Sequence, residues 1–350
     1  MDIFLYVVLI AVGIALIVKC GDWFVDSASW VAKISGIPTF VIGATIVSLG
    51  TTLPEIITSC IAAAQGSVEL AIGNAVGSVN ANIGLIMAIS LMFIPALISR
   101  RDFFPKAGLL ILAIGSLWAV CIPGKLYLGL SFIILAIFAA FIVENLLSAK
   151  RHKAKEINDE SFENDQVKEE KYKPKDGKEI AKYIILFIVG AAGIAGGAFL
   201  LSTFGEKLAY EIGNLAGVDH SVMSSIVGVT IIAIGTSLPE LTTTIIAITK
   251  KQHELSIGNI IGANIIDITL ILPLCTIISA ISPIATGNAL PVNTQTLYLD
   301  LPYCLLAASL AVVPPLIFKK TMRWQGFVLI ATYAGYITLL FLRTFGVLTF

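Results

Sequence analysis

Charged residues are scarce in this 350-residue chain: Asp, Glu, Lys and Arg make up 13% of it, against roughly a quarter in a typical soluble domain. The 23 basic residues balance the 23 acidic ones, so no positive excess points to nucleic acid. Cysteines are few and follow no CxxC or Cys/His spacing, which argues against a metal site or a disulfide framework. We interpret the five cysteines, mostly inside apolar runs, as packing residues: Cys20, Cys60, Cys121, Cys275 and Cys304.

Long apolar runs dominate the sequence, which is 57% hydrophobic and has a mean hydropathy of +0.92. Runs of about 20 residues recur along the chain, the length that crosses roughly 30 Å of hydrocarbon. The first run lacks a basic flank and a small-residue cleavage site, so we expect a retained span rather than a signal peptide. We predict an all-α polytopic membrane protein with ten spans, at about 3–19, 38–63, 70–98, 107–122, 126–147, 182–203, 223–248, 255–281, 297–318 and 325–346.

One segment interrupts this pattern. Residues 150–182 hold ten Lys/Arg and nine Asp/Glu, a composition that cannot bury enough apolar surface to fold alone. We therefore predict a flexible charged linker at 150–181 between two membrane halves, 1–149 and 182–350, with five spans each. If the linker is cytoplasmic, 20 of the 23 Lys and Arg residues fall inside, so the positive-inside rule places both termini outside.

The two halves repeat each other at an offset of 185 residues. "GTTLPE" at 50–55 returns as "GTSLPE" at 235–240, and "GNAVG" at 73–77 returns as "GNIIG" at 258–262. Because each half has an odd number of spans, the halves enter the membrane in opposite directions. Inverted repeats of this kind are typical of secondary transporters, whose binding sites lie near the midplane on broken helices.

The repeated motif places polar chemistry where apolar helix is expected. Pro54 and Pro239 each leave a carbonyl four residues earlier without its N–H partner, and we expect the helices to be irregular there. Thr51, Thr52 and Glu55 share one helix face. The following spans add two polar stripes at four-residue spacing: Asn74, Ser78 and Asn82 in the first half, and Asn259, Ala263 and Asp267 in the second.

Together these stripes offer carboxylate, hydroxyl, amide and carbonyl oxygens without His or Cys, a set that suits hard cations such as Ca²⁺ and Na⁺. A buried carboxylate is costly unless a partner compensates its charge. A single intramembrane glutamate can serve merely to cap a helix or to hold helices together. Glu55 and Glu240, each after a proline at the same repeat position, favour cation ligands instead. No nucleophile and base pair accompanies them, so we predict no enzyme and no cofactor.

The segments "GATIVSLGTTLPE…GNAVGSVNANIG" and "GVTIIAIGTSLPE…GNIIGANIIDI" resemble the paired α-repeats of the cation/Ca²⁺ antiporter superfamily, the sodium/calcium exchangers of prokaryotic type. The resemblance implies ten helices, alternating access and a sliding gate made of the first and sixth helices. It also implies a central group of metal sites. Glu55, Glu240, Thr51 and Thr236 would bind Ca²⁺, Asn82 and Asp267 would complete the middle site, Ser48 and Ala233 would offer carbonyls, and Thr52, Ser237 and Ser78 would complete flanking Na⁺ sites.

One position departs from the family pattern: the serine 23 residues after the glutamate is kept as Ser78 but becomes Ala263 in the second half. The coupling ion is therefore open. We expect an inner- or plasma-membrane antiporter that exports Ca²⁺ against Na⁺. The alternatives are a Ca²⁺/H⁺ antiporter with Asp267 as proton carrier, a K⁺-dependent Na⁺/Ca²⁺ exchanger or, in another class, a cation channel. The expected partners are inorganic cations and the lipid bilayer.

Overall fold

The computed structural model describes residues 2–66, 68–93, 99–160, 177–215, 237–282, 289–344 and 347. These residues are almost entirely helical and include nine helices that are long and apolar enough to cross a membrane. A shorter apolar helix, Leu238–Thr249, occupies the end of the predicted span 223–248; the rest of that span, up to residue 236, lies outside the described residues. The predicted all-α membrane fold is confirmed.

The elements follow one another in two comparable series, with η marking π-helical turns. The first series is α1 (Asp2–Ser35), α2 (Thr39–Ile42), η1 (Gly43–Val47), α3 (Ser48–Ala64), α4 (Val68–Ala81), η2 (Asn82–Met87), α5 (Ala88–Phe93), α6 (Arg100–Cys121), β1 (Lys125–Tyr127) and α7 (Leu128–Glu160). The second is α8 (Gly177–Leu215), α11 (Leu238–Thr249), α12 (His253–Ile266), η4 (Asp267–Ile271), α13 (Leu272–Ile281), β2 (Ala289–Pro291), η5 (Thr296–Asp300), α14 (Leu301–Phe318) and α15 (Arg323–Thr344).

The sequence repeat is preserved in the backbone. Helices α4 and α12 begin at residues 68 and 253 and end at residues 81 and 266, so both boundaries differ by 185. Each helix is followed at once by a π turn, which begins at Asn82 in one half and at Asp267 in the other. The two halves therefore share not only a motif but the same interruption of the helix.

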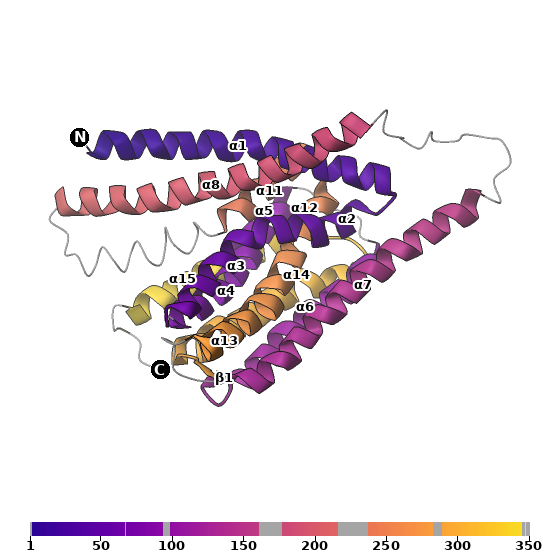
Figure 1. Ribbon diagram of the computed structural model, residues 1–350. Helices are drawn as coiled ribbons and strands as arrows, with labels where there is room; N and C mark the ends of the chain where they lie inside the picture. The colour runs from indigo at the N-terminus through magenta and orange to yellow at the C-terminus, as the bar shows by residue number, and fades with distance from the viewer. Residues whose placement is uncertain are drawn as a thin grey trace.

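Two long helices, α1 and α8, lie side by side along one edge of the molecule (Figure 1). They run antiparallel and touch through small residues, because a Cβ on Gly13 would lie 2.9 Å from the carbonyl oxygen of Gly197. Such close backbone approach is how helices associate in lipid. Further along the pair, Trp30 and Tyr183 stack with their ring centroids 4.4 Å apart.

Helix α12 lies in the middle of the remaining bundle, where it packs against α2, η1 and α3. All its residues from Leu255 to Ile266 are buried. Glycines permit this crossing: a Cβ on Gly258 would overlap the carbonyl oxygen of Phe40, and one on Gly262 would lie 2.5 Å from the Ser48 hydroxyl. The crossing brings the polar residues of α3 against those of α12.

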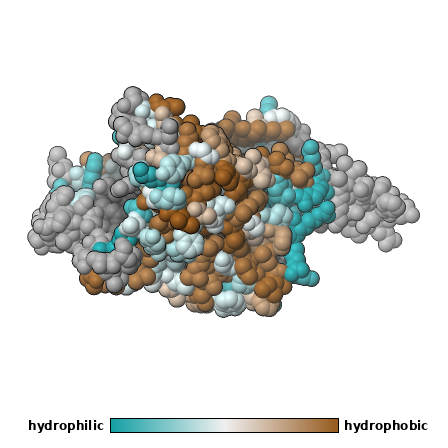
Figure 2. All heavy atoms as spheres, turned by 90° about the horizontal axis from the view of Figure 1, so that it is seen from below, coloured by the Kyte–Doolittle hydropathy of each residue, from teal (hydrophilic) through white to brown (hydrophobic). Residues whose placement is uncertain are grey.

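The molecule has two distinct ends. The start of α1 and the end of α15 lie at one end, and the end of α7 and the start of α8 lie at the other (Figure 1). A two-stranded antiparallel sheet, in which Lys125 pairs with Pro291, joins the two halves. Figure 2 shows a broad hydrophobic band across the middle of one face, with hydrophilic residues on both sides of it. This arrangement fits a multi-pass membrane protein.

Three boundaries differ from the predicted ones. Helix α1 continues to Ser35 instead of ending near residue 19, because Phe24, Ala28 and Ala32 extend a buried stripe at four-residue spacing. It ends where Gly36 adopts a positive φ of 66°, the usual helix stop. The predicted linker is also partly helical, since α7 runs to Glu160 and α8 begins at Gly177.

The prolines of the repeated motif act differently in the two halves. Helix α3 runs through Pro54 without a break, so the expected irregularity in the first half takes the form of the π turns η1 and η2 instead. Pro239 lies in the first turn of α11, a position where the missing N–H has no intrahelical partner to lose. The described residues thus contain a helix start, rather than an internal kink, at the second motif.

Candidate cation-binding site

Three acidic side chains from three elements are buried in the middle of the bundle. Glu55 comes from α3, Glu240 from the first turn of α11 and Asp267 from the first residue of η4, and each is 1% exposed. They lie close enough to interact electrostatically, Glu55 with both others and Asp267 with Glu240. Two of the three come from the second repeat and one from the first, so the cluster forms where the repeats meet.

Most oxygens of this cluster have no hydrogen-bond donor among the described residues. Burying such groups without a partner is unfavourable, and for ionised carboxylates the cost is especially large. A cation would satisfy several of these oxygens at once. The buried acceptors without a partner are Glu55 Oε1 and Oε2, Glu240 Oε2, Asp267 Oδ1 and Oδ2, and Asn82 Oδ1.

Two threonines of the first repeat reach across to the second. The Thr52 hydroxyl donates a long hydrogen bond to Glu240 Oε1 at 3.5 Å, and the Thr51 hydroxyl lies 3.2 Å from Asn259 Oδ1. Thr51 also lies 3.3 Å from the carbonyl oxygen of Ser48, one turn earlier. The predicted grouping of Thr51, Thr52 and Glu55 on one face therefore places hydroxyl oxygens beside the second-repeat glutamate.

The π turns η2 and η4 begin at Asn82 and Asp267, which occupy equivalent positions in the two repeats. A π turn inserts an extra residue into a helix and occurs often at functional sites. Because both turns occur at equivalent repeat positions, the irregular backbone coincides with the polar residues of the predicted middle site. This interruption of α4 and α12 was not predicted from the sequence.

The other predicted ligands are placed as follows. Ser48, Ser78 and Ser237 are buried, at 0%, 1% and 2% exposure. The Ser48 hydroxyl donates to the carbonyl oxygen of Thr45 at 3.0 Å, and the Ser237 hydroxyl has no partner among the described residues. Two further predicted ligands, Thr236 and Ala233, lie outside the described residues.

The two asparagines that begin the polar stripes have different surroundings. Asn259 meets Thr51 at the cluster, whereas the Asn74 amide donates to the Ser59 hydroxyl at 2.9 Å and ties α4 to α3. Asn259 lies two turns before Asp267 on the predicted polar stripe, but it was not among the predicted ligands. Asn264, a buried amide with no partner among the described residues, lies off the stripe, so the sequence gave no signal for it.

The acidic groups could not form a metal site by themselves. Across the described ranges, no three His, Cys, Asp or Glu side chains gather as a metal cluster would require. A cation here would need hydroxyl, amide and carbonyl oxygens as well, which is the mixed oxygen set that Ca²⁺ accepts. Helix α12 also presents Ala263, fully buried, where α4 presents Ser78, so one hydroxyl is missing from that set.

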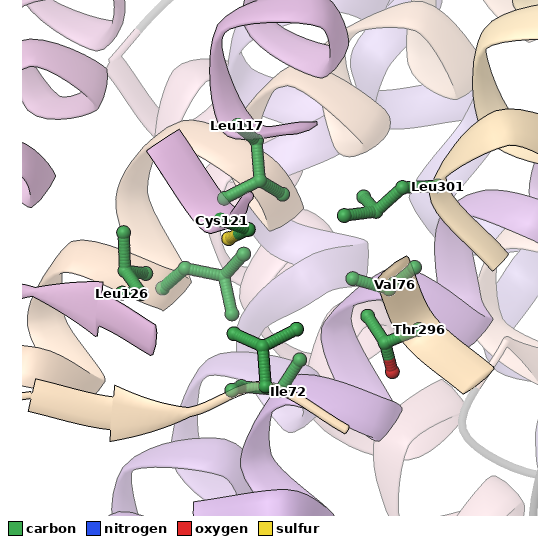
Figure 3. Close-up of a pocket in the computed structure, with 9 residues that line it drawn as sticks. Ile72, Val76, Leu117, Cys121, Leu126, Thr296 and Leu301 are labelled. Atoms are coloured by element: carbon green, nitrogen blue, oxygen red, sulfur yellow. The ribbon is translucent and has the colours of Figure 1, made fainter. Parts of the chain in front are cut away.

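A small cavity lies elsewhere, between α4, α6 and the sheet. Its labelled side chains, among them Ile72, Leu117 and Leu126, present mainly carbon atoms (Figure 3). Its volume of about 10 Å³ matches at most a single water. The cavity belongs to the apolar packing and offers no cation ligands comparable to the acidic cluster.

Comparison with known proteins agrees with this architecture. The sequence pattern of the family described as "Sodium/calcium exchanger protein" matches residues 5–147 and 182–342. The chain belongs to the sodium/calcium exchanger family. The match covers both repeats and omits the charged segment between them.

Similarity to individual relatives extends over most of the chain. It is 29% identical over 368 residues to the sodium/calcium exchanger MaX1 of Methanosarcina acetivorans, covering 95% of this chain and 97% of MaX1. It is 31% identical over 282 residues to the inner membrane protein YrbG of Escherichia coli, covering 79% and 82% of the two chains. A solved structure of the sodium-calcium exchanger NCX_Mj, soaked with Na⁺ and Sr²⁺, superposes with a TM-score of 0.76 at 25% identity, covering 96% of this chain and 99% of that one.

Proposed function

We propose that this protein is a secondary active antiporter that exports Ca²⁺ in exchange for Na⁺ by alternating access. The observation that carries the proposal is the cluster of Glu55, Glu240 and Asp267, which is buried where the two inverted repeats meet and has several oxygens without a donor in the described part of the chain. A relative that spans nearly the whole chain, MaX1, is named a sodium/calcium exchanger. A shared site of this kind would release one ion before taking up the other.

In this account the predicted ligands divide into two groups. Glu55 and Glu240 coordinate Ca²⁺ directly, with Asn82 and Asp267 completing the middle site. The hydroxyls flanking them bind Na⁺. The proposed ligand set is Glu55, Glu240, Thr51, Thr236, Asn82, Asp267, Ser78, Thr52, Ser237 and the carbonyls of Ser48 and Ala233.

The gate in this account is the α1–α8 pair. The two helices contact each other closely through glycines. Helix α1 also contacts α11, at Gly21, where an added Cβ would overlap the Ile246 side chain. At one end, the Lys250 ammonium lies 3.1 Å from Asp22 and 2.9 Å from Asp26 of α1. Sliding of the pair would break these ion pairs and open the site to the opposite side.

Energetics make the number of Na⁺ sites decisive. Exporting one Ca²⁺ against a ~10⁴-fold gradient and ~100 mV costs about 10 kcal/mol, whereas each Na⁺ entering down a ~10-fold gradient returns about 3.7 kcal/mol. Two Na⁺ return about 7.4 kcal/mol and three about 11 kcal/mol. A chain that lost one Na⁺ site could not maintain so steep a gradient with Na⁺ alone.

One observation favours a second candidate, a Ca²⁺/H⁺ antiporter. Ala263 replaces a hydroxyl on α12, and one turn later both oxygens of the Asp267 carboxyl lack a partner among the described residues. A proton on Asp267 could replace the Na⁺ that the missing hydroxyl would have helped to bind. The two candidates share the carboxylates and differ only in the coupling ion.

For the orientation, we propose that the charged segment is cytoplasmic and both termini are outside. Asp102 at the start of α6 pairs with His152 near the end of α7 at 2.8 Å, so these helix ends lie together. Several exposed basic residues lie at this same end, at the start of α6 and between α14 and the start of α15: Arg100, Arg101, Lys319, Lys320 and Arg323. Lys and Arg concentrate on the cytoplasmic side of membrane proteins. The protein then resides in the inner or plasma membrane.

The test is ⁴⁵Ca²⁺ uptake by the protein reconstituted in liposomes. Uptake driven by an outward Na⁺ gradient alone would support sodium coupling. Uptake that requires a pH gradient would instead assign the coupling ion as H⁺, and a requirement for K⁺ would assign a K⁺-dependent exchanger. Uptake that does not respond to any counter-ion gradient would contradict antiport and indicate a channel.

A further inference from the structure

A second charged feature lies away from the acidic cluster, where α6 begins and α14 ends. Its defining contact is made by Arg100. The guanidinium donates two hydrogen bonds to the carbonyl oxygen of Leu316, one from Nη2 and one from Nε at 3.0 Å. This contact joins the first turn of α6 to the last turn of α14. Five exposed basic residues gather there, and we call them the basic patch: Arg100, Arg101, Lys319, Lys320 and Arg323.

The two segments that form the basic patch contain no exposed acidic residue. The segment 316–326 contains no Asp or Glu, and the acidic residue in the first turn of α6, Asp102, is 3% exposed. Its carboxylate faces inward, where it accepts a hydrogen bond from Ser148 at 2.7 Å and pairs with His152. The exposed residues of these two segments, 99–101 and 316–326, therefore carry basic charge without an exposed acidic residue among them.

A cavity of about 540 Å³ lies within this patch, lined by Arg100, Arg101, Phe104, Pro105 and Leu316. One side of it offers two guanidinium groups and the other offers apolar side chains. Guanidinium groups bind phosphate oxygens through paired N–H donors. The lining thus suits a ligand with an anionic head and a hydrocarbon body.

The surroundings place this cavity at the boundary of the membrane. Phe104 is 62% exposed, Phe318 57% and Trp324 45%. Trp side chains are enriched where hydrocarbon meets headgroups, and basic pockets between membrane helices on the cytoplasmic side bind anionic headgroups. Apolar chains of a lipid could lie along these rings while its phosphate reaches the arginines.

We propose that the cavity binds an anionic phospholipid, with the phosphate between Arg100 and Arg101 and the acyl chains along Phe104 and Phe318. Lys319 and Lys320 supply additional attraction for the negative headgroup. Such a lipid would join α6 to α14 on the outer surface of the bundle. The site is separate from the proposed ion pathway and would stand whichever ion drives transport.

The experiment is native mass spectrometry of the full-length protein in detergent, titrated with phosphatidylglycerol, with phosphatidylcholine and with inorganic phosphate. Wild-type protein is expected to retain one phosphatidylglycerol at least tenfold more tightly than phosphatidylcholine, and inorganic phosphate at the same concentration should not displace it. Equal retention of the two lipids, or displacement by inorganic phosphate, would overturn the proposal.

Matched variants assign the binding to the basic patch. The triple substitution R101Q/K319Q/K320Q, which leaves the Arg100 contact with α14 intact, is expected to weaken phosphatidylglycerol retention at least tenfold. The control, K150Q/K178Q/K251Q, removes the same charge from exposed lysines outside the patch and should retain the lipid like wild type. R101Q alone, with a single exposed change, should weaken retention about threefold. Unchanged retention in R101Q and in the triple variant would refute the site.

Discussion

Glu55 is 1% exposed, and neither of its carboxylate oxygens has a donor among the described residues. Its neighbours Glu240 and Asp267 add negative charge instead of relieving it. A carboxylate that has a purely structural role inside a membrane protein normally pairs with a positively charged side chain or with hydrogen-bond donors. At the scale of single residues, this imbalance is the strongest argument that the cluster serves a cation.

Neutralising either glutamate should therefore abolish exchange without unfolding the protein. Glu55→Gln or Glu240→Gln removes a charged ligand and should weaken Ca²⁺ binding roughly 100-fold or more. Both ⁴⁵Ca²⁺ uptake in liposomes and equilibrium binding in detergent would measure the loss. Thermal stability without Ca²⁺ should be retained, because the substitution also removes the repulsion between carboxylates.

Glu254→Gln is the matched control, since Glu254 is an exposed carboxylate at the start of α12. It should transport like wild type. If a glutamine variant at Glu55 or Glu240 exchanged Ca²⁺ as fast as this control, the proposed ligands would have to be abandoned.

Ala263 gives a second prediction at this scale. Ala263→Ser restores the hydroxyl that Ser78 offers in the other half, and should add one bound Na⁺ and steepen the Na⁺ dependence of Ca²⁺ uptake. Ala263→Cys has a similar volume but a soft sulfur that Na⁺ binds poorly, so its Na⁺ dependence should match wild type. An unchanged Na⁺ dependence in a folded serine variant would show that this position is not part of a Na⁺ site.

Which residues join the site was predictable only where the motif repeats. Glu55, Thr51 and Thr52 follow from helical spacing, and Glu240 follows from the repeat. The contact between Thr51 and Asn259 depends on how α3 crosses α12, a tertiary relation that no local pattern encodes. For the same reason Asn74 and Asn259, equivalent in sequence, have different partners.

At the scale of elements, the crossing of α12 with α2, η1 and α3 determines the site. Gly258→Ala should disturb it, because the added methyl would overlap the Phe40 carbonyl, and overpacking of this kind typically costs about 1–3 kcal/mol. A lower thermal unfolding midpoint and weaker Ca²⁺ binding are expected together, since Asn259 is the next residue.

Gly108→Ala is the control for this change, because a Cβ on that exposed α6 glycine meets no atom within 4 Å. It should keep the wild-type midpoint. Equal midpoints for the two variants would mean that α12 does not need the close approach we describe.

Helix positions were predictable from apolar runs, but their ends and interruptions were not. The second half of α1 is too polar to count as a membrane span, yet its buried stripe keeps it helical against α8. Pro54 predicted a break, but helix α3 runs through it. The π turns at Asn82 and Asp267 have no sequence signal beyond the repeat itself, because a π turn results from packing rather than propensity.

For the whole molecule, the opposed halves predict a defined topology. In cells, a cysteine introduced by Ser161→Cys in the charged segment should be protected from a membrane-impermeant maleimide until the membrane is permeabilised. Lys125→Cys, on the exposed side of β1, should react in intact cells. Both variants would be made in a background without native cysteines. The reverse labelling pattern would invert the proposed orientation.

The overall architecture was the most predictable level. Apolar runs, the charged segment and the 185-residue offset together define two inverted halves, and the matching boundaries of α4 and α12 reproduce that offset. What could not be predicted is the coupling ion, because Na⁺ and H⁺ would use the same buried carboxylates and differ only in one hydroxyl at position 263.

The central claim is that one site, shared by Ca²⁺ and its counter-ion, lies between the repeats. The most direct measurement is equilibrium ⁴⁵Ca²⁺ binding to the purified protein at increasing Na⁺ concentration, repeated at several pH values. We predict that Na⁺ displaces Ca²⁺ competitively, with a steepness that counts the Na⁺ ions, and that Glu240→Gln abolishes the binding. Ca²⁺ binding that neither Na⁺ nor protons displace would contradict a shared site and with it the proposed antiport.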